Sequence, residues 1–388
     1  MIAGRVTRAV RSAGALAAAV LAFGVLRADT CPVIIGTRHD GPGRGISVAQ
    51  FDLQTGGLST PRLVAETPQP VFWVGDDAAQ HVYFCHGLDR FEDRAEGFIS
   101  AFRVVADDDT LVLINQVAIG GRGASHVNLD HSGQWLLEAS YRSGHVAVFG
   151  LRPDGGIGLR TALVQHTGRS IHPSRQTSPH PHAIYPDPTN RYLLVPDLGL
   201  DKILVYRLDA TAGTITPHDP AALDLPPGSG PRHLAWHPDG RRAFATLELS
   251  NAVAALSWDA TLGTLSLRQT VSTLPEGFTG ENTAAEVAVH PSGNYVYASN
   301  RGTDNSIAVF AVDTGPGPLS AIERVSSRGQ WPRNFSIDRS GRWMIVSNHD
   351  SDSLAVFSID RSTGRLTPVG EPVTAPHPFG TRFLEPRR

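Results

Sequence analysis

A strand–turn–strand pattern recurs along this chain about every 50 residues. One copy reads GPRHLAWHPDGRRAFATLELSNAVAAL from Gly230, and related copies begin at Ser125, His182, Ala285 and Arg333, with a weaker one at Val71. The tight turn between the first two apolar runs is centred on Gly133, Asn190, Gly240, Gly293 and Gly341 in the five clear copies. Further runs follow, separated by turns such as D-x-x-x-G-x-L, so each unit predicts four short antiparallel strands. Four strands in a repeat of this length indicate one blade of a β-propeller.

The first and last units are incomplete in complementary ways. The segment CPVIIGTRHDGPGRGISVAQFDLQTGGL, from Cys31, matches a unit from its second strand onward. The chain ends with PHPFGTRFLEP, a single strand-like segment with no continuation of the repeat. We predict that this segment supplies the inner strand of the first blade and closes the ring, which removes exposed sheet edges. The predicted fold is all-β, a seven-bladed propeller of four-stranded antiparallel blades over residues 31–388.

Polar residues fall at equal distances from the turns. Positions equidistant from a hairpin turn lie side by side, so residues eight before and eight after the turn share the opposite end of the blade. Because the inner strands of a propeller line its channel, we expect these residues around the channel mouth. The positions eight and seven before the turns hold Ser125, His182, Arg232, Ala285, Arg333, His126, Ala183, His233, Glu286 and Asn334. The positions eight after the turns hold Tyr141, Leu198, Glu248, Arg301 and His349.

These rim positions differ in charge from blade to blade, whereas the apolar runs resemble one another. Such variation suits a site in which different groups surround one ligand. The arginines favour an anionic ligand, because the guanidinium fork binds carboxylate or phosphate through two hydrogen bonds. A structural alternative stays open, in which the channel is merely wet and Arg232 and Glu248 form a cross-strand ion pair.

Several of these segments resemble the lactonase family of seven-bladed propellers, which includes propeller-type 6-phosphogluconolactonases and fungal 3-carboxy-cis,cis-muconate lactonizing enzymes. The resemblance spans residues 32–385 and rests on SPHPH, VPDLGLDKILVYRLD, GPRHLAWHPDG, FTGENTAAEVAVHPSGNYVYASNRG and WPRNFSIDRSGRW. Carried over motif by motif, it implies a catalytic set of His182, Arg232, Glu248 and Arg301, with His180 as the second choice for the histidine. The segment TLELS lacks an asparagine that many relatives have before the glutamate, but it keeps the carboxylate.

The resemblance implies a lactone hydrolase, and we expect it to act without metal or other cofactor on a small anionic lactone of the sugar type. Glu248, or Glu286 near it, is expected to deprotonate water, and His182 to donate a proton to the leaving alkoxide or to position the base. Arg232 and Arg301 are expected to stabilise the oxyanion and to hold an anionic substituent. Alanine at Arg232 or Glu248 should then abolish activity with little change in melting. The expected substrate-binding residues are His180, His233, Glu286, Arg333, Asn334 and His349.

Two other functions stay open. The same cationic site could serve a muconate-type cycloisomerase, in which the acid protonates an alkene carbon as the lactone forms. Alternatively, the propeller could bind a protein or a cell-surface glycan without catalysis.

A histidine-rich segment, IHPSRQTSPHPH, raises the question of a metal. His172, His180 and His182 include an H-x-H spacing that can place two imidazoles on one side of a strand. However, the neighbouring prolines restrict the backbone, and neither a cysteine nor a close carboxylate completes a set of ligands. We therefore expect no metal.

The first 30 residues differ from the repeats. Arg5, Arg8 and Arg11 precede the apolar run AGALAAAVLAFGVL at residues 13–26, which is typical of a secretory signal and short for a membrane span. We expect a periplasmic or secreted protein without stable membrane insertion after removal of the signal. An uncleaved anchor, or a cytoplasmic protein with a misassigned start codon, is the alternative. Neither the cleavage site nor the oligomeric state follows from the sequence.

Charge and cysteine content give two further expectations. The net charge of −3 argues against nucleic acid as a partner, because no basic excess is available to neutralise phosphates. Cys31 and Cys85 are the two cysteines, and both fall in predicted strands. We expect unreactive core thiols, although a disulfide between them stays open.

Overall fold

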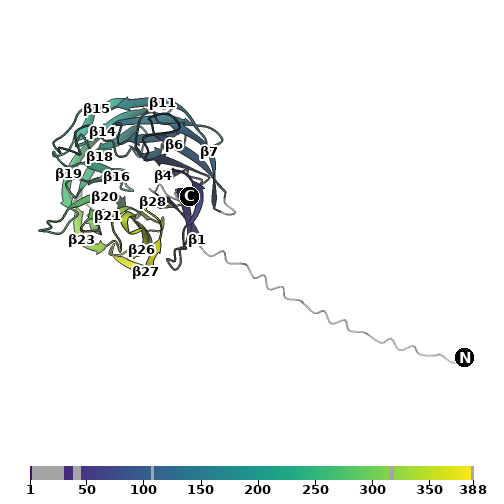
Figure 1. Ribbon diagram of the computed structural model, residues 1–388. Coiled ribbons are helices and arrows are strands. Elements are labelled where there is room, and N and C mark those ends of the chain that lie inside the picture. The colour runs from purple at the N-terminus through teal and green to yellow at the C-terminus, as the bar shows by residue number, and fades with distance from the viewer. Residues whose placement is uncertain (2–29, 38–44, 106–108, 314–318, 386–388) are drawn as a thin grey trace.

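The computed structural model describes residues 1, 30–37, 45–105, 109–313 and 319–385. The predicted signal segment at residues 1–30 therefore lies almost entirely outside the described residues, as does most of the GPGRG segment at 41–45. Figure 1 shows the described strands arranged as a ring around a central channel, with β16, β20 and β28 near the centre and β7, β15, β19, β23 and β27 at the perimeter. The prediction of an all-β, seven-bladed propeller is confirmed by seven separate four-stranded antiparallel sheets.

Each blade extends from an innermost strand at the channel to an outermost strand at the perimeter. In that order, blade 1 contains β28 (Pro378–Phe383), β1 (Thr30–Thr37), β2 (Gly45–Asp52) and β3 (Arg62–Glu66). Blade 2 contains β4 (Pro70–Gly75), β5 (His81–His86), β6 (Phe98–Val105) and β7 (Thr110–Ala118). Blade 3 contains β8 (Ala124–Leu129), β9 (Trp135–Ser140), β10 (His145–Leu151) and β11 (Ile157–Gln165). Blade 4 contains β12 (Tyr185–Pro186), β13 (Tyr192–Asp197), β14 (Lys202–Asp209) and β15 (Thr214–Asp224).

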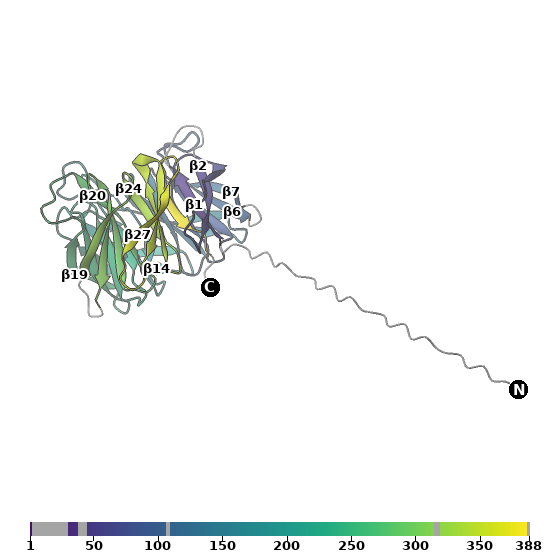
Figure 2. The same cartoon turned by 90° about the horizontal axis from the view of Figure 1, so that it is seen from below.

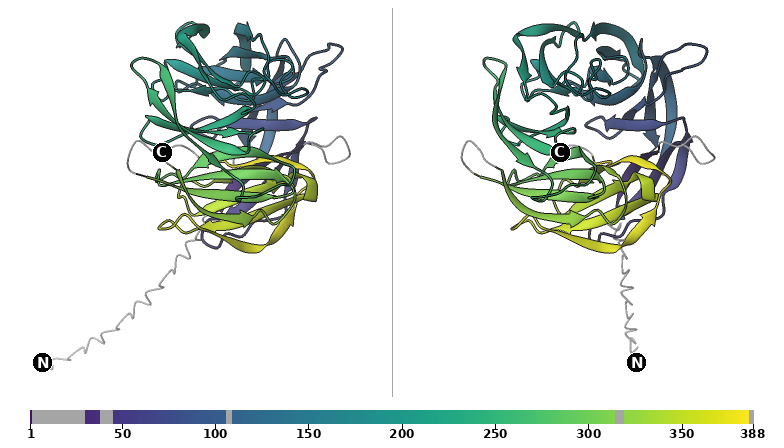
Figure 3. Two further views of the ribbon diagram at one scale, coloured as in Figure 1. Left: turned by 90° about the vertical axis from the view of Figure 1, so that its left-hand side faces the viewer. Right: turned by 60° about the vertical axis from the view of Figure 1, so that its left-hand side comes forward.

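The remaining three blades follow the same order. Blade 5 contains β16 (Pro231–Trp236), β17 (Arg242–Leu247), β18 (Ala252–Asp259) and β19 (Thr264–Ser272). Blade 6 contains β20 (Asn282–Val289), β21 (Tyr295–Gly302), β22 (Ser306–Val312) and β23 (Leu319–Ser326). Blade 7 contains β24 (Pro332–Ile337), β25 (Trp343–Asn348), the short 3-10 helix η1 (His349–Ser351), β26 (Ser353–Ile359) and β27 (Leu366–Thr374). In Figure 2 the same disc is seen after a quarter turn, and Figure 3 gives two further views of it.

The C-terminal strand closes the ring as predicted. β28 pairs antiparallel with β1, so the first blade joins the two ends of the propeller. It also contacts blade 7, where the Thr381 backbone amide donates to Asn334 Oδ1 at 3.1 Å and its hydroxyl lies 3.1 Å from Ser347 Oγ. The pairing of β28 with β1 therefore joins residues that are nearly a full chain length apart.

Apolar packing lies between the blades. Each of the seven pairs of neighbouring blades has a cluster of buried side chains, including the pair formed by blades 7 and 1. The aromatic residues that follow the turns contribute to these clusters, among them the buried Tyr192, Tyr297 and Trp343. This packing accounts for the similar apolar runs in every repeat.

The predicted turns adopt the backbone conformation that their residues favour. Gly133, Asn190, Gly240, Gly293 and Gly341 all have a positive φ, between 58° and 80°. Glycine and asparagine tolerate this left-handed region better than other residues, which explains why they mark the repeat.

Both cysteines are buried free thiols, so they do not form a disulfide with each other in this structure. Burial raises the pKa of Cys31 to about 12 and that of Cys85 well above its usual value. Thiols that stay protonated are poor nucleophiles, in agreement with the expectation of unreactive core residues. Over the described part of the chain, no helix has the length and apolar character needed to cross a bilayer.

Candidate active site

The inner strands carry a bulge at the position eight residues before the turn. The strand register skips Val71 in blade 2, Ser125 in blade 3 and Arg333 in blade 7, and it shifts around Arg232 and Ala285 in blades 5 and 6. In blade 1 the same skip falls on Phe379. A bulge redirects a side chain out of the regular strand alternation, and bulges are frequent beside functional sites.

Blade 4 departs from this pattern. Its inner strand is reduced to Tyr185–Pro186, and the preceding segment joins the blade through a single bridge between Pro181 and Asp197. The prolines of SPHPH cannot donate ladder hydrogen bonds, so this segment does not form the strand that the repeat suggests. The His182 backbone amide nevertheless donates to Pro196 O at 2.9 Å, which fixes its position.

A cavity of about 320 Å³ opens where these positions meet. Six of its lining residues stand eight residues before or after a turn in the five clear repeats: Ser125, Tyr141, His182, Glu248, Arg301 and Arg333. The other residues that line it are Val71, Gly87, Gly123, Ala124, Arg142, Arg175, Thr283, Trp331 and Phe379. The wall toward blades 1 and 2 is small or apolar, whereas the remaining wall carries four arginines, Arg142, Arg175, Arg301 and Arg333.

Glu248 is the centre of a buried ion cluster. Its two carboxylate oxygens receive Arg175 Nη2 at 2.5 Å, Arg232 Nε at 3.0 Å and Arg301 Nη2 at 2.9 Å. Burial alone would raise the pKa of Glu248, but Arg301, Arg232 and Arg175 overcome this effect and lower it to about 2. The carboxylate is therefore ionised at neutral pH and a weak base.

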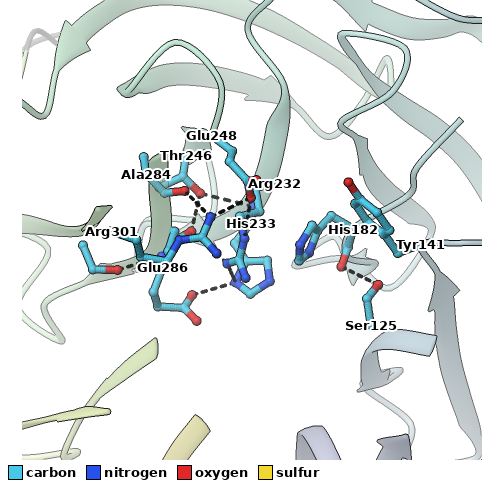
Figure 4. Close-up of polar contacts among 12 residues, drawn as sticks. Ser125, Tyr141, His182, Arg232, His233, Thr246, Glu248, Ala284, Glu286 and Arg301 are labelled. Atoms are coloured by element: carbon cyan, nitrogen blue, oxygen red, sulfur yellow. Dashed lines mark hydrogen bonds and ion pairs between the residues drawn. The ribbon is translucent and has the colours of Figure 1, made fainter. Parts of the chain in front are cut away.

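Backbone carbonyls of β20 fix two of these arginines. Arg232 Nη1 donates to Ala285 O at 3.0 Å, and Arg301 Nη2 donates to Ala284 O at 3.1 Å (Figure 4). Burial lowers the pKa of Arg232 to about 10, which still leaves it protonated at neutral pH. Arg232 is 2% exposed and lies behind Glu248, so it does not line the cavity, whereas Arg301 does.

His182 lies on the cavity wall between Tyr141 and His233 (Figure 4). Its ring makes edge contacts with both, at centroid distances of 5.3 and 5.1 Å, and its Nδ1 is buried without a hydrogen-bond partner. Burial, followed by the nearby charge of Arg232, lowers the pKa of His182 well below 6.5. The imidazole is therefore neutral at physiological pH.

His180 lies outside this cavity. Its ring stacks on Tyr141 at 4.5 Å, and its Nδ1 lies 2.8 Å from the Tyr141 carbonyl oxygen. The Asp197 carboxylate accepts the His180 backbone amide at 2.7 Å. In this arrangement His180 supports a lining residue and does not face the cavity.

The residues seven before the turns lie one level deeper in the channel. His233 Nδ1 is 2.9 Å from Glu286 Oε1, and Asn334 Nδ2 donates to Glu286 Oε2. Burial tends to raise the pKa of Glu286, but His233 and then Arg232 lower it to about 2. A small space of about 10 Å³ lies at this level, and Val71, Ser125, Arg333 and Phe379 line both it and the cavity above. The sequence predicted one ring of polar residues, whereas the structure has two levels.

The last two predicted residues belong to blade 7. Arg333 lines the cavity, and its guanidinium carbon lies 3.8 Å from the centre of the Phe379 ring. His349 is in η1, where its Nδ1 is 2.5 Å from Asp350, and its ring is 5.7 Å from that of Phe379. His349 therefore contacts a lining residue and does not itself line the cavity. A regular strand end was expected at this position, but the chain turns into the helix instead.

Sequence reasoning missed Arg175 and Arg142. Arg175 belongs to the connection between β11 and β12, outside the repeat, and reaches the cavity to bind Glu248 and the Tyr141 hydroxyl. No offset from a turn predicts a residue in an insertion. Arg142 follows the rim residue Tyr141 and pairs with Asp89. Because Arg142 directly follows a predicted rim residue, its sequence position alone could have suggested that it lies near the cavity.

In the histidine-rich segment, His172 has a local structural role. His172 Nδ1 accepts the backbone amides of Ser174 and Arg175 at 3.3 and 3.2 Å, which shapes the turn that carries Arg175. No three His, Cys, Asp or Glu side chains in the described ranges are grouped so that they could hold a metal ion. Independence from metals and cofactors stays a prediction.

Comparison with known proteins gives a consistent result. The family model described as lactonase, 7-bladed beta-propeller, matches residues 32–383. The chain is 34% identical to the 6-phosphogluconolactonase of Bacillus subtilis over 350 residues, which covers 90% of this chain and 97% of that protein. It is 33% identical to the solved periplasmic gluconolactonase of Pseudomonas aeruginosa, with a TM-score of 0.86 over 91% of this chain and 99% of that one. A putative 6-phosphogluconolactonase structure from Bacteroides fragilis is 27% identical, with a TM-score of 0.84 over 92% and 98% of the two chains.

The family match spans nearly the whole propeller, and the similarity to the Bacillus protein extends over almost the full length of both chains. The seven four-stranded blades agree with this match. The chain belongs to the lactonase family of seven-bladed β-propellers.

Proposed function

We propose that this protein hydrolyses a sugar-type lactone that carries an anionic group, and that the reaction takes place in the channel-mouth cavity. The observation that carries the proposal is a cavity lined by Arg142, Arg175, Arg301 and Arg333 together with a neutral histidine, His182. The names of the similar proteins, 6-phosphogluconolactonase and gluconolactonase, support the reaction class. A volume of about 320 Å³ suits a small molecule.

The arginines have two roles in this proposal. Arg301 lines the cavity and keeps a buried Nε–H without a hydrogen-bond partner, so it can donate to the oxyanion that develops on the lactone carbonyl. Arg175 and Arg333 are placed to hold the anionic substituent through charge-assisted hydrogen bonds. Arg232 supports the cluster from below, because it contacts Glu248 and not the cavity.

Glu248 serves to organise these arginines and not as the general base, a role for which the sequence suggested either Glu248 or Glu286. Its pKa of about 2 and its three arginine partners leave it little affinity for a proton. His182 has one N–H and one basic nitrogen when neutral, so it can pass a proton to the ring oxygen as the C–O bond breaks.

One side-by-side assay tests the function. Purified protein should be offered gluconolactone, 6-phosphogluconolactone and a carboxymuconate at equal concentrations. We expect proton release from at least one of the two sugar lactones, reduced about 100-fold or more when Arg301 is replaced by alanine. Conversion of the carboxymuconate alone would instead indicate a cycloisomerase. No turnover of any of the three, together with tight binding of a protein or glycan, would indicate a non-catalytic propeller and contradict the proposal.

We also propose that the protein is exported. The basic and apolar pattern of residues 1–30 supports this location, as does the similarity to a protein described as a periplasmic gluconolactonase. An exported enzyme would meet lactones outside the cytoplasm. Fusion of residues 1–40 to alkaline phosphatase tests the location, because this reporter is active only after export. A fusion without phosphatase activity would place the protein in the cytoplasm.

A further inference from the structure

We propose that His233 and Glu286, which lie one level deeper in the channel than the channel-mouth cavity, form a dyad in which His233 is the general base that activates the attacking water. This inference rests on the proposed lactone hydrolysis and adds the group that the site otherwise lacks. Glu248 is occupied by three arginines, and the reaction still needs an acceptor for a proton from water. His233 meets the geometric requirements for that acceptor.

The contact with Glu286 determines which nitrogen of His233 is basic. Glu286 is ionised, so the 2.9 Å contact with His233 Nδ1 requires a hydrogen on that nitrogen. Arg232 Nη1 lies farther from the same nitrogen, at 3.3 Å, and a protonated Nδ1 cannot accept from it. The lone pair is therefore on Nε2. A carboxylate that holds the far side of an imidazole is the arrangement by which hydrolases orient a histidine base.

Glu286 is itself held in place. Asn334 Nδ2 donates to its Oε2, and the Val287 backbone amide donates to its Oε1 at 3.2 Å. Asn334 in turn accepts the Thr381 amide of the closing strand β28. The carboxylate therefore has fixed hydrogen-bond donors on both oxygens, which keeps the His233 ring in one orientation.

A small space next to His233 has about the size of one water. His233 Nε2 is buried and has no hydrogen-bond partner. His233 lines the space of about 10 Å³ beneath the cavity, which is close to the volume that one water molecule needs. Ser125 and Arg333 line both this space and the cavity above, so a water held there lies between Nε2 and a bound lactone.

The proposed step balances in atoms and charge. The water oxygen forms a bond to the lactone carbonyl carbon, its proton goes to His233 Nε2, and the C=O electron pair moves onto the carbonyl oxygen beside Arg301. The tetrahedral intermediate then breaks its bond to the ring oxygen, which takes the N–H proton of His182, and His182 regains a proton from solvent. The product acid ionises, and His233 returns its proton to solvent. Glu286 stays ionised and stabilises the imidazolium while it exists.

Two other histidines, His126 and His182, share the channel but lack this support. His126 lies 5.6 Å from His233 between the rings of Phe72 and Tyr185, and its Nδ1 faces the Ile184 amide at 3.5 Å. Among these three channel histidines of the described chain, His233 is the one whose ring pairs with a carboxylate. His126 thus offers a matched control of the same residue type, burial and depth.

The experiment compares His233→Gln, Glu286→Gln and the control His126→Gln on whichever sugar lactone the wild-type protein hydrolyses. His233→Gln should lower kcat by about 10² to 10⁴-fold with a KM within about threefold of wild type. Glu286→Gln keeps the side-chain volume but removes the charge that favours the imidazolium of His233. The value of kcat should therefore fall, and the acid limb of its pH profile, where kcat declines because His233 becomes protonated, should move to lower pH. His126→Gln should keep kcat and the pH profile. Melting curves accompany all three variants.

Distinct results separate the possible failures. If wild-type protein hydrolyses no lactone, the proposed function is wrong. If wild type is active and His233→Gln keeps its kcat, or Glu286→Gln leaves the acid limb in place, the dyad is wrong while the function stands. If His233→Gln does not fold, the pH profile of Glu286→Gln decides the question, because a purely structural role would lower melting without moving that limb.

Discussion

At the scale of single residues, the site depends on a charge cluster that is removed from water. Glu248 and Arg232 are 3% and 2% exposed, and both interact with the buried side chain of Arg301 or with each other, whereas Arg175 is partly exposed. Removing one ion from such a cluster is strongly destabilising, because the remaining charges then lack a counter-charge in a place that water solvates poorly. The cluster therefore couples the shape of the cavity to the stability of blades 5 and 6.

This burial changes the expected effect of mutations at Glu248. We predict that Glu248→Gln lowers the free energy of unfolding by roughly 3–5 kcal/mol, because three arginines lose their counter-charge. The expectation from sequence, little change in melting, did not take into account that these residues are buried. Urea denaturation measures the effect. The control Asp224→Asn breaks the exposed pair with Lys202 and should change stability by less than about 1 kcal/mol. Equal effects of the two substitutions would contradict the account.

Arg175 should determine how well a charged substrate binds. We predict that Arg175→Ala raises the KM for an anionic lactone about 10- to 100-fold, the loss expected for one charge-assisted hydrogen bond. The KM for a neutral lactone of the same size should change far less. Arg268→Ala, at an exposed position on β19 away from the cavity, is the control. An equal rise in KM for both lactones would show that Arg175 shapes the cavity and does not recognise the anionic group of the substrate.

At the scale of strands and turns, much of this site could be predicted. The repeat placed Ser125, His182, Glu248, Arg301 and Arg333 at one rim, because hairpin register depends only on distance from the turn. The repeat could not show how deep in the channel each side chain lies. The bulge eight residues before the turn separates the side chain of Arg333 from that of its neighbour Asn334, so the two lie at different levels. It also could not show Arg175, which sits in an insertion, or the turn of the chain into η1 at His349. These features depend on contacts between blades that no single repeat encodes.

The closing strand β28 should be essential for folding, but it should work equally well at the N-terminus of the chain as at the C-terminus. We predict that deleting residues 378–388 prevents cooperative folding, because blade 1 loses its inner strand and Asn334 loses the Thr381 amide. A chain that begins with residues 378–385, joined by a short linker to Thr30, should fold normally. The geometry permits this, since the Leu384 amide already donates to Pro32 O at 2.8 Å. Thermal melting of both forms measures the effect. A stable deleted form would contradict the role of β28.

At the scale of the whole molecule, buried ionisable groups line the channel and the gaps between blades. Burial lowers the pKa of His86 and of His233 to about 4, below their value of 6.5 in an unfolded chain. Glu248 and Glu286 have pKa values of about 2 against 4.5. All four groups bind protons more readily when the chain is unfolded. Acid therefore favours the unfolded state in every case.

We predict that stability falls in two stages as the pH decreases. The histidines weaken the folded state as the pH falls from about 6.5 to 4, by roughly 1.4 kcal/mol per pH unit for each group at most. The carboxylates add to this loss as the pH falls from about 4.5 to 2. Differential scanning calorimetry at constant ionic strength measures the trend, and His86→Gln should flatten the first stage. A melting temperature that stays constant between pH 7 and pH 4.5 would contradict it.

The central claim is that the closed ring brings residues from different blades to one cavity that binds a lactone. A crystal structure with a non-hydrolysable anionic sugar lactone analogue tests it most directly. We expect the analogue in the channel-mouth cavity, with its anionic group against Arg175 or Arg333 and its carbonyl between Arg301 and His233. An analogue bound on another face of the disc, or no binding at millimolar concentration, would contradict it.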